Sequence, residues 1–129
     1  MLLMDTHVFL WSLDEDDKLS GAARKAIANS DCCISIVTLW EMAVKASLAR
    51  EERRLDLKRP ISEFQALCRE YDIEILPVTP EDCSCVMSLP HIHEDPFDRM
   101  IIAQAVTRGL PLVTRDENIH KYAELEAVW

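Results

Sequence analysis

Short apolar runs alternate along this chain with longer segments that repeat apolar residues at helical spacing. Four of the runs predict buried strands at residues 2–5, 32–36, 73–76 and 110–114. A last apolar segment at 127–129 predicts an edge strand. Short and continuously apolar strands are typical of parallel sheets, in which both faces are covered. The pattern therefore predicts a buried parallel sheet.

The segments between these strands predict helices, and capping residues mark several of their ends. Ser20 is a suitable N-cap, and so is Asp95, which Pro96 follows at the first helical position. Gly109 is a suitable residue for the end of a helix. The helices are predicted at residues 6–13, 20–29, 38–49, from 60 onward, 79–89, 95–108 and 117–122.

The helix predicted at 38–49 carries residues that matter for chemistry. Thr38 and Glu41 have the spacing of a capping box, which would place Glu41 in the first turn. Trp40 then belongs to the stripe expected to be buried. Lys45 follows Glu41 by one helical turn, where an ion pair can form.

Helices separate the strands throughout, so the crossover connections are expected to be right-handed. We therefore predict an α/β fold with three layers, in which helices cover both faces of a parallel sheet of four to five strands. The 129 residues fit a single domain, 1–129, that can bury its core without disulfides or structural metals.

Charge limits the partners that the surface can bind. The formal net charge of −9 makes general affinity for nucleic acid weak, so a nucleic-acid site needs a local basic patch. One basic stretch exists, but a solvated helix face with its connector explains it as well. Its basic residues are Lys45, Arg50, Arg53, Arg54, Lys58 and Arg59.

The cysteines and the first residues bear on the compartment. Asp5 interrupts the opening apolar residues too early for a secretory signal, and no apolar run is long enough to span a membrane. We therefore expect a cytoplasmic protein with reduced thiols. Cys83, Cys85, His91 and His93 lie near one another in sequence, but their spacing fits no usual zinc site.

Four carboxylates stand where the predicted strands and helices meet. Asp5 ends the first strand, Glu41 and Asp116 follow the second and fourth strands, and Asp98 lies in the first turn of a later helix. Ligands of parallel sheets bind at the carboxyl ends of the strands. We therefore predict an acidic pocket there. Each carboxylate alone has a structural explanation as a helix cap or as a partner of the helix dipole.

Clustered carboxylates repel each other unless a cation is present. Oxygen ligands favour Mg²⁺ or Mn²⁺, which usually pair protein carboxylates with substrate phosphate. The predicted pocket thus points to phosphoryl-transfer chemistry. The histidines are expected to be capping, surface or packing residues. Among them, His7 is the strongest candidate for a functional role. The others are His91, His93 and His120.

Four sequence segments carry a family resemblance: LMDTHVFLW at 3–11, SIVTLWE at 35–41, DPFDRMIIAQA at 95–105 and VTRD at 113–116. Together they make the chain resemble the PIN-domain ribonucleases, in particular the VapC-like toxins of type II toxin–antitoxin systems. The resemblance implies a Rossmann-like PIN fold and a hydrolase that cleaves RNA with the help of Mg²⁺ or Mn²⁺. It also implies an antitoxin protein that neutralises the enzyme.

The resemblance also assigns residues to the site. It implies that Asp5, Asp98 and Asp116 bind one or two metal ions directly or through water, and that Glu41 either binds metal or orients the attacking water. Metal would lower the pKa of that water for in-line attack on the phosphodiester. Supporting hydroxyl positions match Thr6, Ser35 and Thr114.

Three further residues of the matched segments have two readings each. Asp95 is either part of the site or only the cap of its helix. Arg99 and Arg115, each beside an acid, either hold the scissile RNA strand or balance local charge.

Other functions compete with the nuclease. A phosphatase of the haloacid-dehalogenase type would need an Asp two residues after Asp5, where His7 stands. A receiver domain would need a Lys after a late strand, where Arg115 and Asp116 stand. A PIN fold that binds a partner without cleaving RNA is a third reading, which the intact acidic set disfavours.

The tryptophans bear on self-association. Trp11, Trp40 and Trp129 are available for a homodimer or for an antitoxin groove, although core packing is the expected place of Trp40.

Overall fold

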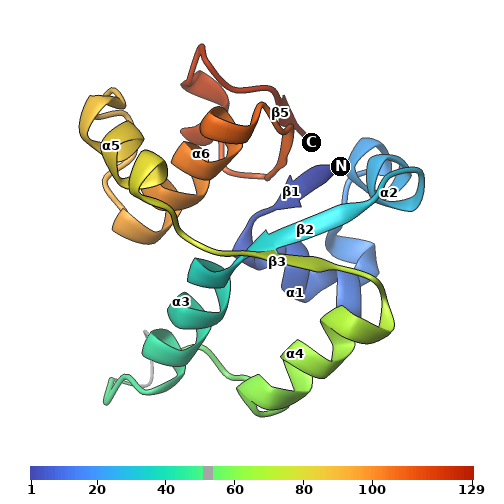
Figure 1. The fold of residues 1–129 in the computed structure, drawn as a ribbon. Helices are drawn as coiled ribbons and strands as arrows, with labels where there is room; N and C mark the ends of the chain where they lie inside the picture. The colour runs from blue at the N-terminus through green and yellow to red at the C-terminus, as the bar shows by residue number, and fades with distance from the viewer. Residues whose placement is uncertain (51–53) are drawn as a thin grey trace.

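The computed structural model, which describes residues 1–50 and 54–129, is built around a parallel sheet. Its five strands follow the order β3-β2-β1-β4-β5, and Figure 1 shows β1, β2 and β3 side by side. All four strand pairs are parallel, as the sequence predicts. The strands are β1 (Leu2–Met4), β2 (Cys32–Ser35), β3 (Glu74–Leu76), β4 (Leu112–Val113) and β5 (Ala127–Val128).

Helices connect the strands. They are α1 (Thr6–Asp14), α2 (Gly21–Ala28), α3 (Ile36–Ala46), α4 (Ile61–Glu70), α5 (Pro80–Ser88) and α6 (Pro96–Arg108). Two single turns of 3₁₀ helix, Asp16–Lys18 and Ile119–Lys121, complete the described elements. None of the helices in the described part of the chain has the length and apolar character needed to cross a membrane.

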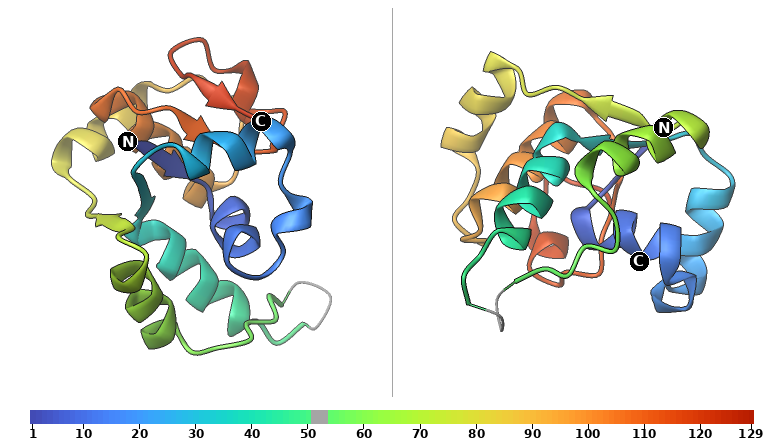
Figure 2. Two further views of the ribbon diagram at one scale, coloured as in Figure 1. Left: turned by 90° about the vertical axis from the view of Figure 1, so that its right-hand side faces the viewer. Right: turned by 90° about the horizontal axis from the view of Figure 1, so that it is seen from below.

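The layers follow from the alternation of side chains along each strand. In β1, Leu2 and Met4 belong to one apolar cluster, whereas Leu3 belongs to the other. The first cluster is completed mainly by α1, α2, α3 and α4, and the second by α5 and α6. The view from below separates the blue α1 and α2 from the gold α5 (Figure 2). The predicted three-layer α/β fold is confirmed.

Most predicted helix ends are confirmed by capping contacts. The Ser20 hydroxyl accepts a hydrogen bond from the Ala23 N–H at 3.0 Å. The Asp95 carboxylate accepts from the Phe97 N–H at 2.8 Å. Gly109 ends α6 in the left-handed conformation with φ of 61°, a conformation that glycine adopts without steric cost.

The predicted start of the third helix is wrong. The helix begins at Ile36 because Ser35, rather than Thr38, is the N-cap and accepts from the Val37 N–H. This earlier start moves Glu41 beyond the first turn, and no capping box forms around it. The buried face also differs from the prediction, because Trp40 is 61% exposed whereas Glu41 is buried.

Two further predictions needed adjustment. The helix expected at 117–122 is only the turn Ile119–Lys121, and the strand expected at 110–114 is shorter. Of the basic stretch, Arg53 lies outside the described residues.

The strand order places the functional site. From β1 the chain builds one side of the sheet through β2 and β3, and it then crosses to β4 and β5 on the other side. The order therefore reverses between β1 and β4. Such a switch point opens a crevice at the carboxyl ends of the strands. Asp5 follows β1 there, and Asp116 lies just after β4.

Candidate active site

Asp5 is fixed at the centre of the site by the helix that it caps. One carboxylate oxygen accepts a hydrogen bond from the Val8 N–H at 2.8 Å, and Thr114 donates its hydroxyl proton to the other. Burial raises the pKa of Asp5, although these two hydrogen bonds oppose the increase. The hydrogen bond from Thr114 to Asp5 is consistent with the supporting role predicted for Thr114.

Asp98 and Asp116 meet at a histidine ring. The Nε2 atom of His93 lies 2.7 Å from an oxygen of Asp116 and 3.3 Å from an oxygen of Asp98. One donor atom from each of the three residues can be chosen so that all lie within 4.8 Å of one another. Asp98 comes from the first turn of α6, and Asp116 from the loop after β4.

The two carboxylates differ electrostatically. Burial, followed by the nearby carboxylates of Asp95 and Glu41, raises the pKa of Asp98 to about 7 against the opposing effect of His93. Burial alone would also raise the pKa of Asp116, but hydrogen bonds with His93 and with the Asn118 N–H hold it below its ordinary value. Of these two carboxylates, Asp98 is therefore the one whose ionised form gains more from a nearby cation.

Glu41 reaches the same region from the buried face of α3. Thr6 donates its hydroxyl proton to one oxygen of Glu41 at 2.6 Å, and Lys45 forms an ion pair with the other. Burial alone would lower the pKa of Lys45, but Glu41 raises it above its ordinary value. Lys45 also lies 3.9 Å from Asp95. The predicted pair of Glu41 and Lys45 and the supporting role of Thr6 both have contacts in the structure.

A hollow with a volume of about 340 Å³ opens above these acids. It brings together three of the four predicted acids, while Glu41 lies close enough to Asp5 and Asp98 to affect both electrostatically. The residues that line the hollow are Asp5, His7, Trp11, Asp98, Arg115 and Asp116.

The structure gives Arg99 a different position from the one expected for an RNA-binding residue. Its guanidinium is buried and donates to main-chain carbonyls, among them those of Val86 at 3.0 Å and Pro90 at 2.9 Å. Arg99 therefore ties α6 to the end of α5. Arg115, in contrast, is exposed at the rim of the acidic hollow.

Two predicted supporting residues serve as helix caps. The Ser35 hydroxyl accepts from the Val37 N–H at the start of α3. Asp95 caps α6, and its carboxylate also faces Lys45. Of the two readings of Asp95, the cap is thus observed, while its electrostatic effect on Asp98 keeps it within the site.

Sequence reasoning missed His93, because the site was expected to contain only carboxylates. The residue stands two positions before the cap Asp95, and its Nδ1 accepts from the Asp95 N–H at 3.1 Å. The contact depends on the conformation of the loop, so the spacing of the residues carried no signal that the ring folds back toward Asp98. No cysteine takes part in the cluster of possible metal ligands found among residues 1–50 and 54–129.

The donor set fits a divalent cation. Carboxylate oxygens with one imidazole nitrogen are ligands that Mg²⁺ or Mn²⁺ can use, and Mn²⁺ tolerates nitrogen better. The raised pKa of Asp98 is further support, because a positive charge offsets both the burial and the carboxylate repulsion that raise it. The fit therefore rests on both geometry and electrostatics.

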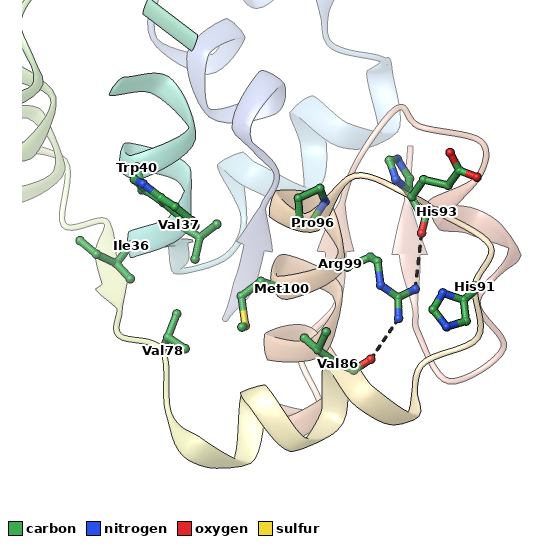
Figure 3. Close-up of a pocket in the computed structure, with 11 residues that line it drawn as sticks. Ile36, Val37, Trp40, Val78, Val86, His91, His93, Pro96, Arg99 and Met100 are labelled. Atoms are coloured by element: carbon green, nitrogen blue, oxygen red, sulfur yellow. Dashed lines mark hydrogen bonds between the residues drawn. The ribbon is translucent and has the colours of Figure 1, made fainter. Parts of the chain in front are cut away.

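A larger groove of about 830 Å³ lies apart from the acidic hollow, between the start of α3, the α5 helix and the start of α6 (Figure 3). Its lining is mostly apolar, with Ile36, Trp40 and Met100 among the exposed or half-buried side chains. Arg99 reaches it only with a guanidinium already bonded to carbonyl oxygens, as the dashed lines show. The groove has no cluster of carboxylates.

Comparisons with known proteins agree with this geometry. Residues 2–125 match the family model described as PIN domain. The chain is 30% identical over 132 residues to Ribonuclease VapC22 from Mycobacterium tuberculosis, and the match covers 99% of this chain and 98% of that protein.

Solved structures share the fold. The structure of VapBC2 from Rickettsia felis, bound to a DNA fragment from their promoter, superposes with a TM-score of 0.68 at 14% identity, covering 98% of this chain and 97% of the other. DNA-bound VapBC from Salmonella typhimurium superposes with a TM-score of 0.64 at 19% identity, covering 98% and 97%.

Proposed function

Since this chain belongs to the PIN-domain family, we propose that it is a metal-dependent endoribonuclease and the toxin of a toxin–antitoxin pair. The observation that carries the proposal is the meeting of Asp98, Asp116 and His93 beside the buried Asp5, at the switch point of the sheet. The relative from Mycobacterium tuberculosis, which is named as a ribonuclease, supports the choice of RNA as the substrate.

Asp98, Asp116 and Asp5 are the residues that would hold the metal. When bound, Mg²⁺ or Mn²⁺ acidifies a coordinated water and neutralises charge on the phosphate. Asp98 offers the carboxylate whose ionisation burial and its neighbours disfavour most clearly. His93 either adds a nitrogen ligand or moves aside and holds Asp116, with which it already shares a 2.7 Å contact.

Glu41 has a supporting role in this proposal. Both of its oxygens are engaged, one by Thr6 and the other by Lys45. Each oxygen keeps a second lone pair that can accept a hydrogen bond from the attacking water, and we assign this orienting role to Glu41; its ion pair also holds the Lys45 ammonium beside Asp95. Lys45 places a fixed positive charge there, which stabilises the charge that develops on the phosphate.

Arg115 is the arginine that we assign to RNA. It lies at the rim of the acidic hollow, and its exposed guanidinium can bind a phosphate oxygen. The buried guanidinium of Arg99 is already used by main-chain carbonyls, so we assign Arg99 to structure instead.

The partner that we propose is a cognate antitoxin protein. The fold is shared with VapBC proteins from Rickettsia felis and Salmonella typhimurium, and VapBC is a family of toxin–antitoxin systems. We also keep the expectation of a homodimer, for which exposed apolar residues such as Trp40 are available.

The experiment that tests the function is cleavage of a mixed pool of structured and single-stranded RNAs by the partner-free protein. Reactions contain Mg²⁺, Mn²⁺ or a chelator, and calorimetry with Mn²⁺ measures metal binding. Asp98→Asn removes the charge that the pocket needs. We expect metal-dependent cutting by the wild type and a loss of at least about 100-fold in the variant, as for other groups that bind a catalytic metal.

Asp31→Asn is the matched control, because Asp31 is an exposed carboxylate just before β2, at the opposite edge of the sheet. It should leave cutting and metal binding unchanged. Expression of the wild type in a bacterium should arrest growth, and expression of Asp98→Asn should not. If the wild type binds Mn²⁺ and cuts no RNA, the chain is a metal-binding PIN fold without nuclease activity, and the proposed function fails.

A further inference from the structure

Two aromatic rings stand at the rim of the acidic hollow. His7 and Trp11 lie one turn apart on α1, with ring centroids 5.7 Å apart and planes inclined by 32°. Both line the hollow that contains Asp98 and Asp116. His7 is exposed and Trp11 is half-buried, so part of each ring is accessible. An aromatic surface thus borders the carboxylates directly.

A second hollow, with a volume of about 350 Å³, also begins at these two rings. It lies between α1 and the segment 55–58. Its charged lining is mixed: Lys18 and Lys58 stand beside Asp14, Glu15 and Asp56, and Lys18 is paired with Glu15. The Lys18 ammonium is 6.0 Å from the centroid of the Trp11 ring. The surface therefore places two aromatic rings between carboxylates that suit a metal and a hollow of mixed charge.

We propose that His7 and Trp11 form a nucleobase-binding subsite, which stacks the base of a nucleotide adjacent to the scissile phosphate of single-stranded RNA. This inference rests on the proposed function and adds the substrate class to it. Aromatic side chains bind unpaired bases by stacking, whereas bases in a duplex are already stacked and paired. The enzyme is thus specific for unpaired RNA at this position.

The charges nearby agree with this placement. The phosphate to be cut would lie at the acids, where metal offsets their charge, and the next phosphate along the strand can approach the exposed Lys58. A hollow of about 340 Å³ lies within the range of about 300–1,000 Å³ that is usual for small-ligand sites. There is accordingly room for a base as well as a phosphate.

Core packing is the competing explanation for Trp11. Its ring also contacts that of Trp129, with centroids 6.1 Å apart, and both rings pack against the apolar cluster beneath α1. Trp129, however, is not among the residues that line either hollow. A substitution of Trp129 therefore disturbs the packing of Trp11 without removing a surface that RNA would touch, which makes it the matched control.

The first measurement is the Kd of a fluorescein-labelled, single-stranded RNA of randomised sequence, with Ca²⁺ present so that the RNA is not cut. Trp11→Leu keeps an apolar side chain but lacks an aromatic face. We expect its Kd to rise by about five- to 150-fold, which corresponds to the roughly 1–3 kcal/mol of one stacked base. Trp11→Phe should recover most of the affinity, and Trp129→Leu should leave it unchanged.

The second measurement locates the base. After the cleavage site in one oligonucleotide has been mapped, each flanking nucleotide is replaced in turn by an abasic one. At one position the abasic substitution should raise the KM of the wild type, and the same substitution should have no further effect in Trp11→Leu. His7→Leu provides a second variant at an exposed position, which keeps the test valid if Trp11→Leu does not fold.

Several outcomes would overturn the subsite. One is an equal loss of affinity in Trp129→Leu and Trp11→Leu, which would assign Trp11 to packing. Another is an abasic penalty that is the same in the wild type, in His7→Leu and in Trp11→Leu. If the wild type cuts RNA with metal while the variants bind it normally, the subsite is wrong and the nuclease stands. If the wild type neither binds nor cuts RNA, both proposals fail.

Discussion

Among single residues, Asp98 has a carboxylate whose ionisation its surroundings disfavour. Its carboxylate is half-buried near those of Asp95 and Glu41, and its pKa of about 7 lies well above the ordinary value of 3.8. Without a cation, the ionised Asp98 carboxylate therefore destabilises the folded protein. Such a cost is common at functional sites, where charge is arranged for a ligand rather than for stability.

The pH dependence of stability tests this cost. Between about pH 4 and pH 7 the folded protein keeps a proton on Asp98 that the unfolded chain releases, so rising pH destabilises the folded state through this residue. Asn cannot ionise. With a chelator present at about pH 8, we expect the melting temperature of Asp98→Asn to lie about 5 °C above that of the wild type. This shift corresponds to a gain of roughly 1 kcal/mol in unfolding free energy.

The difference between the two melting temperatures should shrink as the pH falls and vanish near about pH 3, below the ordinary pKa of 3.8, where Asp98 is mostly protonated in both states of the wild type. Circular dichroism during heating measures it. Asp31→Asn serves again as the control, since Asp31 is exposed. A difference that stayed constant over this pH range would show that ionisation of Asp98 is not what destabilises the protein.

The sequence was a better guide to the acids than to the histidine beside them. Asp5 and Asp116 could be predicted because strand ends converge in a parallel sheet, and Asp98 because it lies in the first turn of a helix within a family motif. His93 could not, because its place depends on a loop conformation in which the ring turns back onto Asp116. The conformation of this loop cannot be predicted from the spacing of its residues in the sequence.

At the scale of elements, the junction of α5 and α6 depends on one buried cation. The guanidinium of Arg99 donates to the carbonyls of Val86 and Leu89 at the end of α5 and to that of Pro90 in the following loop. These are carbonyls for which a helix end needs external donors. The same loop leads to His93, so its conformation sets the geometry of the acidic site.

Substitution of the two arginines separates structure from RNA binding. Arg99→Met keeps the aliphatic volume but leaves buried carbonyls without donors, so we expect a loss of about 2–3 kcal/mol of unfolding free energy. Arg115→Gln, at an exposed position, should change stability by less than about 0.5 kcal/mol while lowering cleavage about tenfold. Urea denaturation and initial cleavage rates measure the two effects. A fully stable Arg99→Met would contradict the structural role.

The position of α3 shows why helix register was harder to predict than helix existence. Two hydroxyl residues, Ser35 and Thr38, can act as the cap, and the capping-box spacing to Glu41 favours Thr38. Burial decides between them: with Ser35 as the cap, Glu41 turns inward toward Thr6, whereas Trp40 turns outward. Tertiary contacts thus override a local signal, as they often do for helix boundaries.

For the whole molecule, the net charge of −9 raises the question of how the protein binds RNA at all. Nucleic-acid affinity that rests on many lysine and arginine contacts decreases steeply with salt. In this protein the basic residues that line the two hollows are only Arg115, Lys18 and Lys58 among the described residues. A divalent cation between the acids and the phosphate would then supply much of the attraction.

The dependence of RNA affinity on metal and salt follows from this balance. With Ca²⁺ present, about three phosphate contacts to a single strand give a slope of about −2 for the logarithm of the binding constant against that of the salt concentration. Removal of Ca²⁺ with a chelator should weaken binding at least about tenfold at constant ionic strength, because the acids then repel the phosphate. Titrations of labelled single-stranded RNA measure both. A salt-dependence slope near −5 that persists in chelator would show that a broad basic surface binds the RNA. The acidic hollow would then not be the main binding site for the phosphate.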